Sequence, residues 1–187
     1  MKKGISLIVL IVTIIVIIIL AAAVILTLNR NNPIDSSRVA QLADNRATIN
    51  SGLQLYFGKV MAQYEGVLEN SEVYTGVTDK KKADGTAITG LSAVAKANTK
   101  VGTTNYYELD TGVVDSQMDV KVPSIANATW YIDVNSGLVY LVYTGSDKIP
   151  AWMFTDSNKT SLDSTLAAFV KVAGTNTIDD YTAPSGN

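Results

Sequence analysis

The stretch ISLIVLIVTIIVIIILAAAVILTL, residues 5–28, contains 21 apolar residues among 24 and no charge. As an α-helix it would extend about 36 Å, enough to cross a hydrocarbon layer of roughly 30 Å. Its β-branched residues disfavour a helix in water, but in lipid the backbone must satisfy its own hydrogen bonds, so a helix forms. Lys2 and Lys3 precede the stretch, which predicts a cytoplasmic N-terminus and an exported C-terminal part.

The composition of the 187-residue chain excludes several chemistries. It contains no cysteine and no histidine, so it offers no thiol nucleophile, imidazole base, disulfide or Cys/His zinc site. Its net charge of −2 argues against nucleic acid as a partner, because binding phosphates needs a basic face. The run Lys80–Lys82 lies between acidic residues and is interpreted as a solvated loop. We expect no cofactor and no metal.

The residues around the start of the apolar stretch form a more specific motif, Lys3-Gly4-Ile5-Ser6-Leu7-Ile8. It resembles the prepilin leader junction of type IV pilins and type II secretion pseudopilins, in which a short basic leader ends in glycine before an aliphatic run. The resemblance implies that a prepilin peptidase cuts between Gly4 and Ile5 and methylates the new amine of Ile5. Gly4 and Ile5 are therefore the predicted processing residues.

Position 9 departs from that pattern, since most pilins carry a glutamate five residues after the cut and this chain carries Val9. The glutamate is thought to neutralise the terminal amine of a neighbouring subunit, and a buried ammonium without a partner costs several kcal/mol. Three arrangements remain open. The amine stays near water, another subunit supplies the acid, or the protein occupies a place such as a filament tip.

Two other interpretations of the N-terminal stretch remain open. A secretory signal peptide would find a small-residue cleavage site at Ala21–Ala23, although the following residues remain strongly apolar. An uncleaved single-pass anchor would carry a surface domain that binds a ligand and does not polymerise.

Beyond the apolar stretch, the pattern predicts an amphipathic helix within residues 29–66. Asn32 fits an N-cap, Pro33 the first helical position and Asp35 the positive first turn. Apolar residues then recur at steps of three and four, as expected for one buried helix face: Val39, Leu42, Ile49, Leu53, Tyr56, Phe57, Val60 and Tyr64. The resemblance implies that this segment continues the N-terminal helix and lies across an antiparallel sheet.

The sheet is predicted from a hairpin, Trp130–Val134 and Leu138–Tyr143, joined by a three-residue loop that ends in Gly137. Pairing of Val134 with Leu138 would place Ile132 opposite Tyr140. Alternating apolar residues at 118–122 indicate a third strand. Asp133, Asn135 and Gly137 have a spacing faintly similar to a calcium loop, but a plain hairpin turn is the preferred interpretation because too few oxygens are in line.

Together these patterns predict an α+β, pilin-like fold with a long N-terminal helix, transmembrane in its first half, packed on a C-terminal antiparallel sheet. The predicted organisation is a leader (1–4), a transmembrane and filament-core helix (5–28), the amphipathic second half of that helix (29–66) and a globular head (67–187). We expect a structural filament subunit rather than an enzyme, since no catalytic motif is present. Its expected partners are other subunits, prepilin peptidase, the assembly machinery and the membrane. The expected location is the inner membrane as a precursor, then a cell-surface filament.

Overall fold

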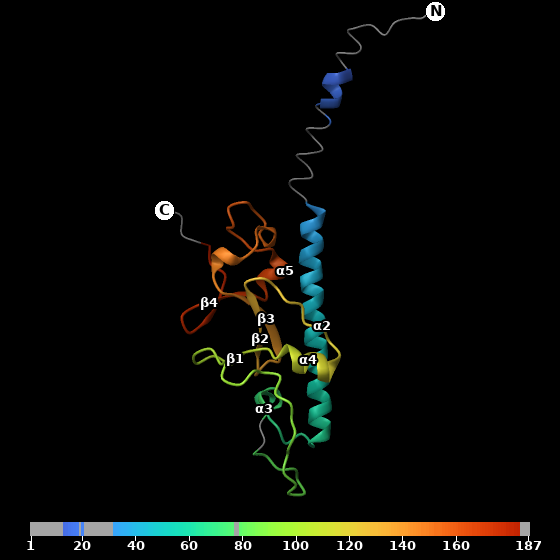
Figure 1. The fold of residues 1–187 in the computed structure, drawn as a ribbon, viewed down its shortest axis with the longest axis vertical. Coiled ribbons are helices and arrows are strands. Elements are labelled where there is room, and N and C mark those ends of the chain that lie inside the picture. Colours follow the sequence, from blue (N-terminus) through green and yellow to red (C-terminus); the bar gives the residue numbers. More distant parts are fainter. Residues whose placement is uncertain (1–12, 19, 21–31, 77–78, 184–187) are drawn as a thin grey trace, which may run out of the picture. The chain divides into compact units, whose positions relative to one another are not determined.

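A computed structural model describes residues 13–18, 20, 32–76 and 79–183 (Figure 1). The chain divides into two compact units, residues 1–38 and 39–187. In the first unit, residues 13–18 and 20 are helical, and their large apolar side chains, such as those of Ile17 and Leu20, are exposed. The processing residues Gly4 and Ile5 and most of the predicted span 5–28 lie outside the described residues.

The helix predicted from the apolar stripe is present as α2, Pro33–Gln63. It begins as the sequence indicates, because the side chain of Asn32 accepts a hydrogen bond from the backbone N–H of Ile34 at 3.1 Å. Asp35 lies in the first turn, where the helix dipole favours a negative charge. One face of the helix is buried, and we call it the inner face: Leu42, Ile49, Gly52, Leu53, Tyr56 and Val60.

The sheet has five strands in the order β1–β2–β3–β4–β5. Their bounds are β1 Tyr106–Glu108, β2 Ala128–Asp133, β3 Leu138–Tyr143, β4 Val170–Ala173 and β5 Ile178–Asp180. Neighbouring strands are antiparallel except β3 and β4, which are parallel. The connection between those two contains the 3₁₀ turns η1 (Ser146–Lys148) and η2 (Ala151–Met153) and the short helix α5 (Ser164–Ala167). The prediction of a purely antiparallel sheet is therefore wrong.

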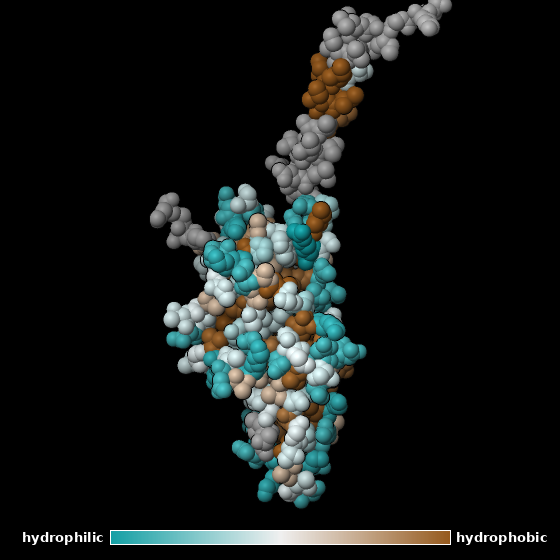
Figure 2. All heavy atoms as spheres, viewed as in Figure 1, coloured by the Kyte–Doolittle hydropathy of each residue, from teal (hydrophilic) through white to brown (hydrophobic). Residues whose placement is uncertain are grey.

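The core of the second unit lies between the inner face of α2 and one face of this sheet (Figure 1). The sheet contributes Trp130 and Ile132 from β2 and Val139, Leu141 and Tyr143 from β3, which are all buried and belong to the same cluster as the inner face. Polar and weakly polar side chains cover most of the face of this unit that Figure 2 shows.

The predicted hairpin is confirmed, but its register is displaced by one residue. Asp133 pairs with Leu138, and Ile132 pairs with Val139 rather than with Tyr140. The turn explains the difference, since the Asp133 carboxylate accepts hydrogen bonds from the Asn135 backbone N–H at 3.0 Å and the Ser136 hydroxyl at 2.7 Å. Asp133 therefore ends the strand one residue earlier than the apolar pattern indicated.

The strand predicted at residues 118–122 is absent, because the chain there leaves a helix. The helix α4, Thr111–Met118, begins where the Asp110 carboxylate accepts from the backbone N–H groups of Gly112 and Val113. It ends at Asp119, which adopts a left-handed conformation with φ of 54°. Val120 and Val122 then pack on the core without pairing in the described sheet. The alternation of apolar and polar residues here reflects the burial of the valines and not the pairing of a strand.

Within residues 13–18, 20, 32–76 and 79–183, no helix combines the length and the apolar character that a membrane span requires. The long helix of this part of the chain, α2, carries charged side chains such as Asp35, Asp44 and Arg46. This finding contradicts the predicted transmembrane helix and the predicted inner-membrane location. The predicted fold class is likewise wrong, since the described structure is mixed α/β with a five-stranded mixed sheet.

Two polar side chains of α2 bind the backbone of β3 where β4 does not reach it. Arg46 Nε donates to the Val139 carbonyl at 2.9 Å, and Asn50 Oδ1 accepts from the Val139 N–H at 3.0 Å. The pairing of β4 begins only at Leu141, so these bonds replace the missing strand. The Arg46 guanidinium also lies 4.8 Å from the centre of the Phe169 ring. Burial lowers the pKa of Arg46, and nearby Tyr140 partly offsets this effect.

Candidate functional site

The hairpin turn that resembled a calcium loop is held by its own hydrogen bonds. Both oxygens of the Asp133 carboxylate bind groups of the turn, as described above. Gly137 follows with φ of 69°, and a Cβ atom at this position would overlap the Tyr74 hydroxyl. Among the described residues, no group of three or more acidic side chains could hold a metal ion. These contacts are those of a hairpin turn.

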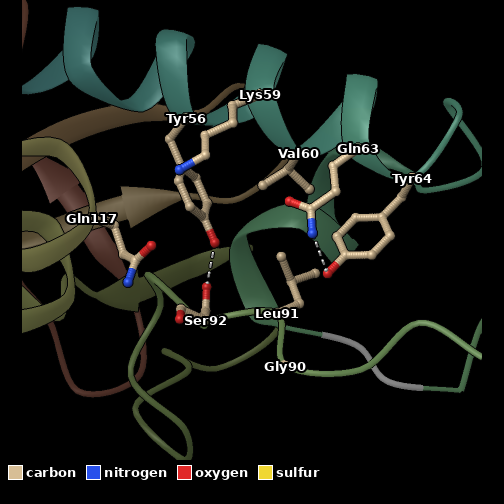
Figure 3. A pocket seen from close by; sticks show the side chains of 9 residues that line it. All are labelled: Tyr56, Lys59, Val60, Gln63, Tyr64, Gly90, Leu91, Ser92 and Gln117. Atoms are coloured by element: carbon tan, nitrogen blue, oxygen red, sulfur yellow. Dashed lines mark hydrogen bonds between the residues drawn. The ribbon is translucent and has the colours of Figure 1, made fainter.

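A small pocket lies between α2, the loop before β1 and helix α4 (Figure 3). Its internal volume is about 70 Å³, whereas pockets for organic ligands usually measure about 300–1,000 Å³. It therefore has room for a single polar group rather than for an organic cofactor. The lining residues are Tyr56, Lys59, Val60, Gln63, Tyr64, Gly90, Leu91, Ser92 and Gln117.

Most polar groups of the pocket bind one another or the surrounding backbone. The Tyr56 hydroxyl donates to the Ser92 carbonyl at 2.7 Å, and the amide of Gln63 donates to the Tyr64 hydroxyl at 3.3 Å (Figure 3). Burial raises the pKa of Tyr56, and Tyr64 adds to the shift, so Tyr56 keeps its proton at neutral pH. Lys59 differs from these residues, since it is exposed and makes no hydrogen bond or ion pair with any described residue.

The side of α2 opposite its buried residues is exposed along the second unit, and we call it the outer face. Its central feature is Leu55, whose side chain is 77% exposed. At position 58 the helix interior contains a glycine, and a Cβ atom added there would meet no atom within 4 Å. The exposed residues of α2 in this part of the chain are Ala40, Gln41, Asp44, Ala47, Thr48, Ser51, Gln54, Leu55, Gly58, Lys59, Ala62 and Gln63.

The face of the sheet that points away from the core carries tyrosines that contact one another and a lysine. The rings of Tyr106 and Tyr140 make an edge-to-face contact with centres 5.3 Å apart. Burial, together with Tyr140 and Asp133, raises the pKa of Tyr106 to about 12. Lys171 lies over the Tyr140 ring and pairs with Asp180.

Comparisons with protein-family models, curated proteins and solved structures found no match to this chain. The arrangement of the site therefore rests on this molecule alone. Sequence reasoning missed both the outer face of α2 and the bonds from Arg46 and Asn50 to β3. The outer face could have been found from the sequence. Leu55 and Gly58 lie outside the apolar stripe of the helix, so burial in the core does not explain why an apolar residue and a glycine occur there. The bonds to β3 had none, because they join residues distant in the sequence.

Proposed function

We propose that this protein is a structural subunit of an extracellular filament of the type IV pilus or secretion pseudopilus class, trimmed by a prepilin peptidase between Gly4 and Ile5. The junction motif at residues 3–8 supports the processing step, since its basic leader, glycine and aliphatic run resemble prepilins. Subunits then associate through their N-terminal segments and through α2. Copies of the same chain are the principal partners.

The observation that carries the proposal is the outer face of α2. A surface helix of a protein that acts alone usually carries polar or charged residues on its exposed side. Here half of the exposed positions between residues 40 and 63 are alanine, serine, threonine or glycine, and Leu55 is exposed among them. Such a surface allows another helix to approach closely, which a filament built from helices requires. Val9 is consistent with such a contact. An assembly that lacks the usual glutamate needs contacts elsewhere on the chain.

Mass spectrometry of the N-terminus tests the processing step. Full-length protein isolated from cells with prepilin peptidase should begin at an N-methylated Ile5, and protein from cells lacking the peptidase should retain residues 1–4. The variant Gly4→Leu should block cleavage, because the residue before the cut is part of the motif. The matched control Ser6→Leu leaves the glycine in place and should still be cleaved.

Electron microscopy of sheared cell-surface material tests the assembly step. Filaments labelled by an antibody against residues 39–183 are expected from cells with the peptidase and not from cells without it. An intact Met1 in peptidase-positive cells, or a start near Val24, would show that the chain is anchored or secreted by another route. Either result would refute the proposal.

A further inference from the structure

The sequence contains two matches to the pattern Asn-x-Ser/Thr, at which an enzyme can attach a sugar to the asparagine amide: Asn127-Ala128-Thr129 and Asn158-Lys159-Thr160. A pattern of three residues also occurs by chance, so the sequence alone does not separate the two. The structure separates them, because the two asparagines lie in different parts of the fold. The difference decides how freely each segment can enter the active site of an enzyme.

Asn158 lies in the middle of the loop 155–161, in the orange part of the ribbon before α5 (Figure 1). The base of this loop is closed, since the Thr155 N–H donates to the Ser161 carbonyl at 2.9 Å. Asn158 itself is exposed, and its side-chain amide makes no hydrogen bond with any residue that the structure describes. The loop therefore presents a free amide to the solvent.

The residues on either side of Asn158 hold the loop in this conformation. The Asp156 carboxylate accepts hydrogen bonds from the backbone N–H groups of Thr160 and Ser161 at 3.1 and 3.2 Å. The Lys159 ammonium faces the Phe154 ring with 5.7 Å to its centre, so this side chain packs on the chain. Asn158 remains exposed between these two attachments. An exposed turn that is held on both sides can bind an enzyme while the rest of the chain stays folded.

Asn127 is also exposed, but the rest of its pattern belongs to the sheet. Thr129 lies in β2 and pairs with Val142 of β3. The carbonyl of Asn127 accepts a hydrogen bond from the Thr144 N–H at 3.2 Å, directly after β3 ends. An enzyme can therefore take up this segment as an extended peptide only after the beginning of β2 has separated from β3.

The hydroxyl at the third position of the pattern is part of what the enzyme recognises, and it is more accessible in the loop. The Thr160 hydroxyl donates to the Asp156 carboxylate at 2.6 Å in a bond at the surface. An enzyme can replace that bond at little net cost, because a hydrogen bond exposed to water contributes little. Asp156 then still holds the loop through its two bonds to backbone N–H groups. Thr129, in contrast, is half-buried within β2.

We propose that Asn158 is the acceptor of an N-linked oligosaccharide and that the fold protects Asn127 from the same reaction. The donor is an oligosaccharide joined to a lipid pyrophosphate. The Asn158 amide nitrogen forms a bond to the anomeric carbon of the first sugar while the bond from that carbon to the pyrophosphate oxygen breaks. The lipid pyrophosphate leaves with the electron pair, and the amide proton passes to a base of the transferring enzyme. The inference rests on the proposed function only in placing this part of the chain outside the cell, where such patterns are modified.

Peptide mapping by mass spectrometry tests the proposal on full-length protein isolated from the cells that naturally produce it. Trypsin releases Asn158 in a peptide that begins at residue 149 and Asn127 in the peptide 122–148, so the two positions are measured separately. The first peptide should carry added sugar masses, and electron-transfer fragmentation should locate them on Asn158. Occupancy of Asn158 should exceed that of Asn127 at least about tenfold, because a segment paired in a sheet is available only in the few molecules that have opened locally.

Four variants define the site. Asn158→Gln should remove the sugar, and Thr160→Ala should remove it as well, because the hydroxyl of the pattern is lost. Thr160→Ser is the matched control, since it keeps the hydroxyl and should remain modified. Asn127→Gln should leave the attached mass unchanged. The Asn158 amide makes no bond within the described chain, so Asn158→Gln should keep the thermal midpoint of enzymatically deglycosylated protein, and loss of the sugar is then not a result of unfolding.

Three results would overturn the proposal. The first is a peptide with Asn158 at its unmodified mass. The second is a sugar located on the hydroxyl of Ser157 or Thr160 or on the amine of Lys159, since each is a different chemistry. The third is equal occupancy of Asn127, which would show that transfer precedes folding and that the fold does not select the site.

The outcomes also separate this inference from the proposed function. An unmodified Asn158 in filaments whose subunits begin at a methylated Ile5 would refute the inference and leave the proposed function intact. A sugar on Asn158 of a chain that still begins at Met1 in peptidase-positive cells would support the inference and refute the processing route.

Discussion

The inner and outer faces of α2 differ in the size and burial of their side chains, although they belong to the same helix. The inner face contains large apolar side chains that are nearly or completely buried, such as Ile49 and Leu53 at 0% exposure. The outer face contains small side chains around Leu55, which is 77% exposed. The first face is explained by the chain's own sheet. The second face is exposed to solvent along residues 40–63.

The two glycines show how to separate these explanations. Gly52 is required by Val120 and Met118 of the same chain, whereas Gly58 meets nothing. Gly58 therefore weakens the helix without relieving any steric conflict in its own fold. The following predictions test this contrast through the free energy of unfolding of the second unit.

Removing a large apolar side chain should have very different effects on the two faces. Leu53→Ala deletes a fully buried side chain and should lower the free energy of unfolding by about 3 kcal/mol. Leu55→Ala, the matched change on the outer face, should change it by less than about 0.5 kcal/mol. Urea unfolding followed by tryptophan fluorescence measures both. Equal losses would mean that Leu55 packs against its own chain.

The bonds from α2 to β3 should contribute the next largest effect. Arg46→Met keeps much of the stem over Phe169 but leaves the Val139 carbonyl without its donor, which should lower the free energy of unfolding by about 2 kcal/mol. Arg38→Met is the control, because Arg38 forms an exposed pair with Asp35 worth less than about 0.5 kcal/mol. A smaller loss in the first variant than in the control would contradict the assigned role of Arg46.

Replacing Gly58 or Gly52 by alanine should change the free energy of unfolding in opposite directions. Gly58→Ala should raise the free energy of unfolding by about 1 kcal/mol, because alanine favours the helix and the added methyl meets no atom. Gly52→Ala should lower it, because the methyl overlaps Val120 and overpacking outweighs the gain in helix propensity. The same unfolding measurement decides the point. If Gly58→Ala is destabilising, the outer face is not open in the free chain.

A smaller effect should appear at alkaline pH through the buried Tyr143. Burial raises its pKa to about 12 from an ordinary value of 10, so the folded chain keeps this proton longer than the unfolded chain. Stability is therefore fully present below pH 10 and falls as the pH rises toward 12. Linkage gives a loss of about 0.8 kcal/mol at pH 10.5. The variant Tyr143→Phe should lack this component when both proteins unfold at pH 9 and pH 10.5.

The elements that the sequence predicted well are those with long, regular patterns. The stripe from Val39 to Tyr64 spans many turns, so its period identifies the helix now seen as α2. The hairpin was likewise visible from its apolar strands and Gly137, but its register depended on one side chain. Asp133 binds the turn, and a displacement of one residue moves each strand residue to a different partner.

The features that escaped prediction depend on contacts between distant residues. The parallel pairing of β3 with β4 joins Leu141 to Val170, and no local pattern indicates it. The apolar alternation at residues 118–122 was misinterpreted because Val120 packs on α2 without a partner strand. Gly4 and Ile5 were identified from a sequence motif and not from a packing pattern. Their role in processing stays a prediction, which mass spectrometry of the N-terminus tests.

The parallel strand β4 has a consequence for the order in which the chain can fold. The first three strands and α2 are all present once residue 143 has been synthesised, but Leu141 then still lacks the Phe169 carbonyl that accepts its N–H. Arg46 likewise lacks the Phe169 ring, the nearer of the two aromatic rings that its guanidinium faces. In a chain that is still being synthesised, β3 therefore pairs with β2 on one side only, until about thirty more residues have been added. Until β4 and β5 are synthesised, the hydrogen bonds of Arg46 and Asn50 to Val139 hold β3 against α2.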